Sequence, residues 1–263
     1  MPNYSIKVIA VAIGKAREKS RYTYLTNFGQ KIDIGYNVFL IEGNGRKILV
    51  DTGGSAKQRE MLLKSRQSNE FYNWDQHPLD VEDVTPLEEG LAHWQLAPED
   101  IDTVILTHLH WDHVMNVMKL PNARVVVQEA EWEAALSPHP LHKFYYASRD
   151  FYENLRNVEL VNGDIEFFPG IRLLLTPGHT PGGQSVIVQT EKGKYAISGF
   201  CTILENFYPS KKLQTQIGHS VIPAGIHLDA AAAYESIVKL LQLSDIVLPV
   251  HEITLAQKEH IVG

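Results

Sequence analysis

A short stretch of the chain, VILTHLHWDHVMN at residues 104–116, holds three histidines and a carboxylate within six positions. Its apolar start is typical of a strand buried on both faces. Side chains alternate along an extended segment, so His108 and His110 emerge on one side and can reach the same metal ion. The turn that follows directs Asp112 and His113 toward a second ion. Burying four such groups without partners would be costly, and the stretch therefore predicts a metal site.

Two further histidines end apolar runs in the same way. His179 lies in LLLTPGHTPGG, where glycines let the backbone pass close to a site, and His251 lies in IVLPVHE. Either histidine alone could be a polar strand terminus, but as members of one set of strand ends they are predicted ligands. Asp51 in ILVDTGG is predicted to orient a ligand histidine, the alternative being a turn aspartate bonded to its own backbone.

The elements that must position these residues alternate between strands and helices. Hairpin pairing is expected through EGNGRK, because Asn-Gly favours a tight turn. Helix starts are indicated at Thr85, taken as a cap with Pro86 in the first turn, and at Asp229, and a helix is expected at 129–136. Several strands after residue 158 suggest an antiparallel second sheet. The pattern predicts an α/β fold, a four-layer αββα sandwich. The expected strands are 4–14, 36–43, 47–54, 102–108, 123–128, 158–163, 165–170, 171–179, 184–190, 194–199 and 245–252.

Composition limits the class of protein. The 263 residues are 44% hydrophobic, show no repeat or linker, and are expected to form one domain over 1–263. One cysteine and the absence of a signal-like start favour the cytoplasm, and no apolar run approaches the roughly 20 residues that span a bilayer. A net charge of −7 argues against nucleic acid as a partner. A small-molecule substrate is expected, and a homodimer is compatible with the sequence.

The motifs together resemble the metallo-β-lactamase superfamily. They are H-x-H-x-D-H at 108–113, LVDTG at 49–53, TPGHTPG at 176–182 and the late His251. The resemblance spans about residues 36–252 and is closest to the N-acyl homoserine lactonase branch, followed by thioesterases like glyoxalase II. It implies the αββα fold and two divalent metal ions, usually zinc, with iron or manganese as alternatives. By that resemblance the first metal is held by His108, His110 and His179, and the second by Asp112, His113 and His251.

The sequence departs from the family where lactonases carry a carboxylate that bridges both metals. The corresponding segment reads Ser198, Gly199, Phe200, Cys201. Thiolate is a good zinc ligand, so Cys201 is a candidate for the vacant position. It lies one residue late, however, which reverses the face of a strand unless a bulge restores it. Packing of Cys201 in an apolar core is the alternative.

The resemblance implies a hydrolase that uses a metal-bound hydroxide, oriented by Asp112 as the catalytic residue, to open a lactone or related cyclic ester. A thioester hydrolase, an iron-dependent redox protein and a metal-binding ligand sensor are the alternatives. The substrate is expected to have an apolar portion, because rings at 142–152 and 205–209 could form a pocket wall. Those rings could instead cover the core. The candidate substrate contacts are Phe200, Phe207, Tyr208 and His227, the last of which could be only a polar residue ahead of the Asp229 cap.

Overall fold

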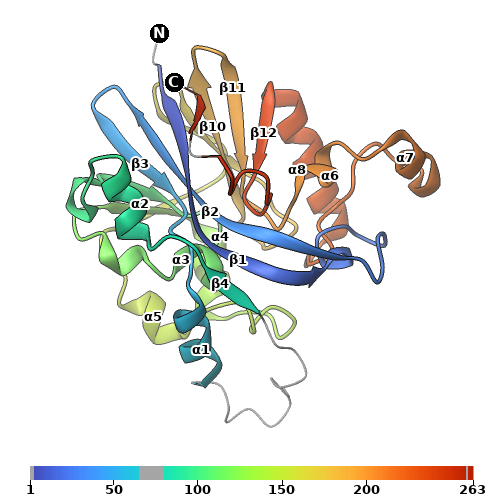
Figure 1. The fold of residues 1–263 in the computed structure, drawn as a ribbon, viewed down its shortest axis with the longest axis horizontal. Helices are drawn as coiled ribbons and strands as arrows, with labels where there is room; N and C mark the ends of the chain where they lie inside the picture. Colours follow the sequence, from blue (N-terminus) through green and yellow to red (C-terminus); the bar gives the residue numbers. More distant parts are fainter. Residues whose placement is uncertain (1–2, 65–79, 259, 263) are drawn as a thin grey trace.

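The structure is a computed structural model that describes residues 3–64, 80–258 and 260–262. Two twisted β-sheets form its centre (Figure 1). The first sheet has the order β13-β1-β2-β3-β5-β6-β7, and β4 pairs with β1 outside this path. Its strands are β1 (Ser5–Glu18), β2 (Lys31–Gly43), β3 (Arg46–Val50), β4 (Val81–Asp83), β5 (Thr103–Ile105), β6 (Arg124–Gln128), β7 (Val158–Val161) and β13 (His260–Val262).

The second sheet has the order β12-β11-β10-β9-β8. All its neighbouring strands pair antiparallel except β11 and β12, which are parallel. The antiparallel prediction is therefore confirmed for the four strands between residues 165 and 199. The fifth strand, β12, is parallel to β11 because helix α8 carries the chain back before it. The strands are β8 (Ile165–Phe168), β9 (Ile171–Leu175), β10 (Gln184–Thr190), β11 (Gly193–Ser198) and β12 (Ile246–Pro249).

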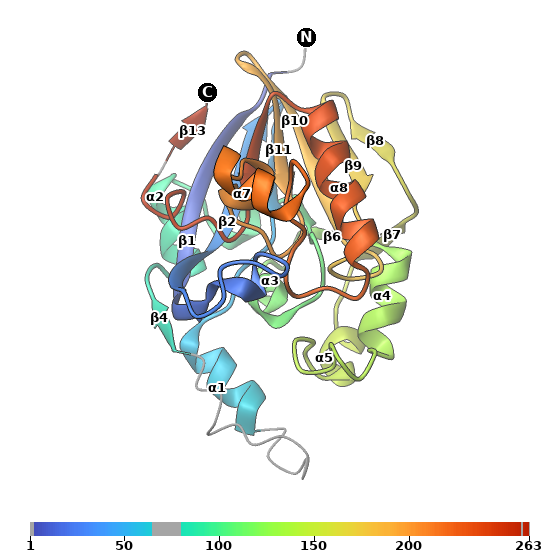
Figure 2. The same ribbon diagram turned by 90° about the vertical axis from the view of Figure 1, so that its right-hand side faces the viewer.

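Helices cover the outer faces of the two sheets. In Figure 2, α8 lies across the second sheet, while α4 and α5 lie below it, and α4 packs against β6 and β7 of the first sheet. The helices are α1 (Ala56–Lys64), α2 (Leu87–His93), α3 (Trp111–Val114), α4 (Glu129–Leu136), α5 (Arg149–Glu153), α6 (Leu204–Phe207), α7 (Lys211–Ile217) and α8 (Ala230–Leu243), with 3₁₀ turns η1 (Lys19–Arg21), η3 (Pro98–Asp100) and η4 (Val117–Lys119). Within the described residues, no helix combines the length and apolar character needed to cross a bilayer.

Alternation along the strands builds three apolar layers between these elements. In β3, Ile48 and Val50 face the second sheet, whereas Leu49 faces the helices of its own side. In β10, Val186 and Val188 face the first sheet, whereas Ile187 packs toward α8. Successive side chains of these strands therefore alternate between a helix layer and the central layer. This arrangement confirms the αββα sandwich.

Most turns and helix ends lie where the sequence predicts them, but one strand belongs to the other sheet. The β2–β3 hairpin turns at Asn44 and Gly45, both with positive φ, as the Asn-Gly pair predicts. Asp229 caps α8 by accepting a hydrogen bond from the Ala232 amide, and α4 occupies the predicted range 129–136. The assignment of 158–163 to the second sheet is wrong, because β7 pairs parallel to β6 in the first. Thr85 is not the cap of α2, which begins one residue later than expected, after Pro86.

Candidate metal centre

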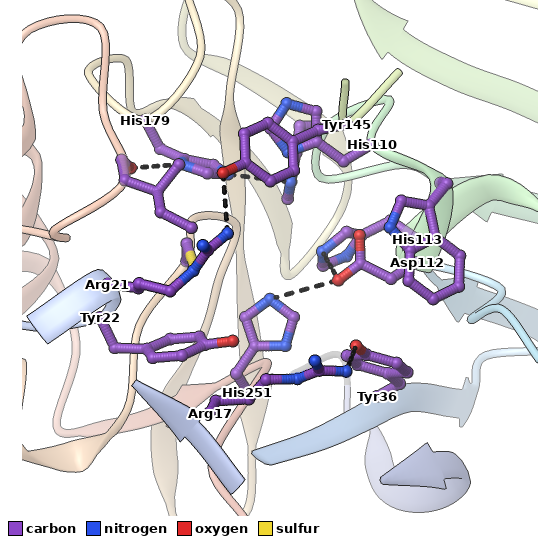
Figure 3. A pocket seen from close by; sticks show the side chains of 14 residues that line it. Arg17, Arg21, Tyr22, Tyr36, His110, Asp112, His113, Tyr145, His179 and His251 are labelled. Atoms are coloured by element: carbon purple, nitrogen blue, oxygen red, sulfur yellow. Dashed lines mark hydrogen bonds and ion pairs between the residues drawn. The ribbon is translucent and has the colours of Figure 1, made fainter. Parts of the chain in front are cut away.

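The predicted ligands lie in turns that follow strands of both sheets. β5 ends at Ile105, and the chain then runs through His108 and His110 into the short helix α3, which carries Asp112 and His113. His179 follows β9 and His251 follows β12, both from the second sheet. The ends of β5, β9 and β12 thus meet at one edge of the sandwich, and Figure 3 shows their side chains converging on one pocket.

Six of these side chains form two groups of potential metal ligands. In each group the donor atoms lie within 4.8 Å of one another. All five histidines are buried, and the Asp112 side chain is 15% exposed. The first group contains His108, His110 and His179, and the second contains Asp112, His113 and His251. This grouping is the one that the family resemblance implies.

In the first group, the Nε2 lone pairs of His108 and His179 point toward each other. Nδ1 of His179 lies 2.6 Å from the carbonyl oxygen of Ile226, which can only accept, so Nδ1 carries the proton. Thr107 Oγ1 gives its proton to Asp51, so His108 Nδ1, at 3.1 Å, must donate to that oxygen. Both Nε2 atoms are then unprotonated, yet they lie 3.2 Å apart. Two nitrogens bound to one tetrahedral zinc would be about 3.4 Å apart, so a cation fits between them.

The second group is arranged around the carboxylate of Asp112. Its Oδ2 lies 3.7 Å from Nε2 of His113 and 3.8 Å from Nε2 of His251. His251 Nδ1 is 3.0 Å from the carbonyl oxygen of Gly35, which fixes its proton on that side and turns Nε2 toward the centre. Nε2 of His113 and of His110 are buried without a hydrogen-bond partner among the described residues. Buried imidazole nitrogens that lack a hydrogen-bond partner in this way fit metal ligands.

Asp51 contacts the second group through the ring nitrogen of His113 that faces away from the centre. Its backbone φ is +62°, a left-handed conformation that aspartate tolerates better than most residues. The buried carboxylate accepts hydrogen bonds from the amide of Thr107 and from its hydroxyl, both at 2.8 Å, and from Nδ1 of His113 at 2.7 Å. It therefore fixes the orientation of His113 and the start of the ligand loop, which agrees with the predicted orienting role.

A second buried carboxylate, Glu131 of α4, ties two ligand loops together. It accepts hydrogen bonds from the amide of Leu109, between two ligand histidines, and from the amide of Gly182 in the His179 loop. The Tyr146 hydroxyl also donates to it. A Cβ at position 182 would lie 2.0 Å from the Glu131 amide nitrogen, so glycine is required for this approach. The sequence offered no signal for Glu131, which resembles any other acidic residue of a helix.

The environment keeps most of the histidines neutral. Burial, followed by the neighbouring histidines, holds the pKa of His108, His110 and His179 well below the usual range. Burial also lowers the pKa of His251 to about 4. His113 differs: burial opposes its charge, but Asp51 and Asp112 outweigh that effect and raise its pKa. Neutral imidazoles are the form that binds metal.

Cys201 lines the pocket but belongs to neither ligand group. It is 5% exposed and packs in an apolar cluster with Tyr22, Tyr36 and Trp111. Burial, with the charge of Asp112, raises the pKa of its thiol well above the usual range. Gly199 cannot supply a bridging ligand either, because a Cβ there would lie 1.5 Å from the carbonyl oxygen of Gln184. The packing alternative for Cys201 agrees with this placement.

The predicted substrate contacts do not lie together. Phe200 and Phe207 are buried in the cluster between the second sheet and α8, with ring centroids 6.1 Å apart. Tyr208 is 54% exposed and lines a different groove, with Leu204 and Lys212. His227 bonds through Nδ1 to the carbonyl oxygen of Ala224, 2.7 Å away. None of the four is among the described residues that line the pocket of the metal ligands, so their predicted role draws no support from their positions.

Other side chains, most of which the sequence did not single out, form the pocket wall. They include Arg17 and Arg21 near the end of β1, Tyr22, Tyr36 and Tyr145. Tyr145 comes from the aromatic segment 142–152, for which a position over a pocket was expected, and its ring lies 5.1 Å from that of His110. From the same segment, His142 is buried with its ring 5.5 Å from that of His110, and its Nδ1 lacks a hydrogen-bond partner among the described residues.

Comparison with known proteins agrees with this site. A sequence model of the metallo-beta-lactamase superfamily matches residues 33–240. An N-acyl homoserine lactonase from a Bacillus species is 36% identical over 166 residues, which cover 62% of this chain and 62% of that protein. One from Bacillus cereus is 33% identical over 168 residues, with the same coverage of both chains. The match thus spans about three fifths of the length of these relatives.

Solved structures share the fold over nearly the whole chain. An N-acyl homoserine lactone hydrolase with the product N-hexanoyl-L-homoserine at its catalytic metal centre has a TM-score of 0.73 at 23% identity, covering 98% of this chain and 96% of that one. AidC, a dizinc quorum-quenching lactonase, has a TM-score of 0.64 at 17% identity, covering 100% and 98%. Since the superfamily match extends over most of the sequence, and the ligand residues of its motifs meet at one edge of the sandwich, this chain belongs to the metallo-beta-lactamase superfamily.

Proposed function

We propose that this protein is a metal-dependent hydrolase that opens the ester bond of lactones. The observation that carries the proposal is the pair of unprotonated Nε2 atoms of His108 and His179, 3.2 Å apart. Two lone pairs at this distance repel each other unless a cation lies between them. The similarity to N-acyl homoserine lactonases supports the ester of a lactone ring as the bond that is cleaved.

The two ligand groups would each hold one divalent ion. His108, His110 and His179 would bind the first, and Asp112, His113 and His251 the second. Zinc is the proposed metal, because imidazole with one carboxylate suits zinc, and a dizinc lactonase shares the fold. When bound, such ions supply a water of lowered pKa and polarise the ester carbonyl.

The residues of the chain position the reactants. Asp112 is the carboxylate of the two ligand groups and lies at the mouth of the centre, where it can accept a hydrogen bond from the attacking water and orient it. Asp51 keeps His113 in one orientation throughout. The phenolic pKa of Tyr36 is raised to about 12 by burial, so its hydroxyl stays protonated in the pocket wall.

The test is a substrate panel with metal content measured in parallel. Homoserine lactones, simple γ-lactones, thioesters and a β-lactam would be offered to zinc-, iron- and manganese-loaded protein, with elemental analysis of each sample. The proposal predicts two ions per chain and ring opening of lactones, and His110→Ala should lose both metal and activity. Retention of full activity by His110→Ala, or cleavage of thioesters alone, would refute it. One ion or none with no turnover would favour the sensor alternative.

The proposal also covers where the protein acts and whether it forms a dimer. We expect the protein to act in the cytoplasm, where a single free thiol such as that of Cys201 stays reduced. A homodimer remains a prediction, which light scattering of the purified protein tests directly.

A further inference from the structure

One tyrosine of the pocket wall combines a buried ring with a hydroxyl that faces the pocket. Tyr22 directly follows η1, is 5% exposed, and lines the pocket that contains both ligand groups. Among the described residues, no group forms a hydrogen bond with its hydroxyl. A buried tyrosine hydroxyl usually has such a partner, because removing it from water without one costs free energy. The Tyr22 hydroxyl is therefore placed to bind a ligand outside the chain.

The other tyrosines of this pocket wall are held by arginines. Nη2 of Arg17 donates to the hydroxyl of Tyr36 at 3.3 Å, and Nη2 of Arg21 donates to the hydroxyl of Tyr145 at 2.9 Å. Both oxygens thus accept a hydrogen bond from the chain itself. By contrast, the hydroxyl of Tyr22 is engaged by no group of the described residues, so it is left entirely for a bound molecule.

The backbone around Tyr22 is fixed by hydrogen bonds on both sides. Its amide donates to the carbonyl oxygen of Lys19 at 2.9 Å, and its carbonyl oxygen accepts from Nδ2 of the fully buried Asn206 at 2.7 Å. The amide of Tyr24 donates to the carbonyl oxygen of Pro223 at 2.9 Å. The phenol is therefore held in place before a ligand arrives, and a preorganised donor needs little rearrangement when charge develops beside it.

The Tyr22 ring lies against the second ligand group. Its centroid is 5.9 Å from that of His251, with the two rings nearly perpendicular. Figure 3 shows the Tyr22 hydroxyl pointing into the pocket toward His251, with Asp112 on the other side of that ring. Asp112 is the residue proposed to orient the attacking water. An ester in this pocket would thus have a water acceptor on one side and a phenol donor on the other.

We propose that Tyr22 is a catalytic residue whose hydroxyl donates a hydrogen bond to the carbonyl oxygen of the lactone. This inference rests on the proposed lactone hydrolysis. Negative charge builds on the carbonyl oxygen when water adds to the carbonyl carbon, so the hydrogen bond is stronger in the transition state than in the bound substrate. The phenol keeps its proton throughout, since a neutral tyrosine is a donor at neutral pH.

The family comparison does not imply this role. Tyr22 lies outside residues 33–240, which the superfamily model matches, and outside each motif of the resemblance. The assignment depends on the burial of the ring, the position of the hydroxyl in the pocket and its lack of a partner among the described residues.

Tyr22→Phe tests the proposal, because it removes the hydroxyl and keeps the ring. On zinc-loaded protein, with the lactone that the wild type opens fastest, we expect kcat to fall about 100-fold while KM changes less than about threefold. Zinc content should stay that of the wild type. Thermal unfolding should occur at the wild-type temperature or above, since the hydroxyl has no partner to lose within the described chain.

Tyr195→Phe is the matched control. Tyr195 is a buried tyrosine of β11 that packs in the layer between the two sheets. The substitution removes the same atom from a ring outside the pocket, so kcat and KM should both stay at the wild-type values.

A cyclic boronate provides a readout without turnover. The boron of 1,2-oxaborolan-2-ol takes up hydroxide from water to give a tetrahedral anion with the ring size of a γ-lactone, which resembles the state that the phenol is proposed to stabilise. Calorimetry should show at least about tenfold weaker binding of this boronate to Tyr22→Phe than to the wild type and to Tyr195→Phe.

The outcomes separate the two proposals. If the wild type opens lactones and Tyr22→Phe keeps kcat within about threefold, the role of Tyr22 is overturned and the hydrolase stands. A rise in KM alone, a loss of zinc or stability in Tyr22→Phe, or an equal loss of kcat in Tyr195→Phe would also overturn it. Boronate binding that is equal or absent in all three proteins would do the same. A wild type that opens no lactone would refute the hydrolase and the role of Tyr22 together.

Discussion

Oδ2 of Asp51 lies 2.7 Å from Nδ1 of His113, and both side chains are buried. Asp51 also accepts both hydrogen bonds of Thr107, so one carboxylate fixes the proposed ligand His113 of the second group and the backbone that leads to the first group. The ligand geometry therefore depends on a residue that is expected to touch no metal.

Asp51→Asn should weaken metal binding about 10–100-fold, the usual cost of losing such a partner. Asparagine tolerates the left-handed backbone, but its amide group cannot accept all three hydrogen bonds at once. Zinc affinity measured by competition with a chromogenic chelator checks this. Asp229→Asn is the control, since asparagine caps a helix as well as aspartate does. Unchanged affinity in Asp51→Asn would mean that His113 is oriented without Asp51.

Glu131→Gln should destabilise the protein by about 1–3 kcal/mol and lower its zinc affinity. The substitution turns an N–H₂ group toward the amide of Leu109 or of Gly182, where only an acceptor is tolerated. Denaturant unfolding and the chelator assay measure the two effects. Glu133→Gln, on the exposed side of the same helix, should change neither. A fully stable Glu131→Gln with normal zinc affinity would show that the ligand loops hold their positions independently.

The metal-free protein should lose stability as the pH falls below about 6.5. Histidines whose folded pKa is lowered resist protonation in the folded state, whereas the unfolded chain takes up protons below its ordinary pKa. Stability is thus present above pH 6.5 and lost as the pH falls toward the folded pKa, about 4 for His251 and also for His142. His113, with a raised pKa, opposes the trend.

Each histidine with a lowered pKa costs about 1.4 kcal/mol per pH unit in this window. Urea unfolding of chelator-treated protein at pH 7.5, 6.5 and 5.5 measures the change. A free energy of unfolding that stays constant over this range would contradict the neutral, buried histidine cluster.

Cys201→Ala should retain the metal content of the wild type. The thiol packs with Tyr22, Tyr36 and Trp111 and lies outside both ligand groups, so alanine removes one sulfur from an apolar cluster. A loss of stability of about 1–2 kcal/mol is expected from the smaller side chain. Elemental analysis after dialysis decides the matter. If one ion per chain is lost, Cys201 is a ligand after all.

The ligand residues could be predicted because each follows a strand in a motif with its own spacing. A strand end is visible in the sequence, and His179 and His251 could therefore be grouped with residues 108–113 far away in the chain. The layers were predictable for the same reason, since alternation shows which residues face a core. The sheet to which β7 belongs was not, because strand patterns carry no information on pairing partners.

The pocket wall could not be predicted from local patterns. Arg17 and Arg21 look like ordinary surface charges, and their position in the pocket wall, with Arg17 buried, arises only when the end of β1 packs beside the loops that carry Cys201 and His251. Phe200 shows the converse error. It neighbours a predicted metal position in sequence, yet it follows the end of β11 and its side chain packs in the apolar cluster that includes Ile237 and Leu240 of α8.

Titration of zinc into chelator-stripped protein, with lactone ring opening recorded at each step, measures whether hydrolysis depends on two bound ions. We expect no activity without metal, and full activity when two ions are bound per chain. Full activity in the stripped protein, or a protein that holds two zinc ions and opens no lactone, would contradict this expectation.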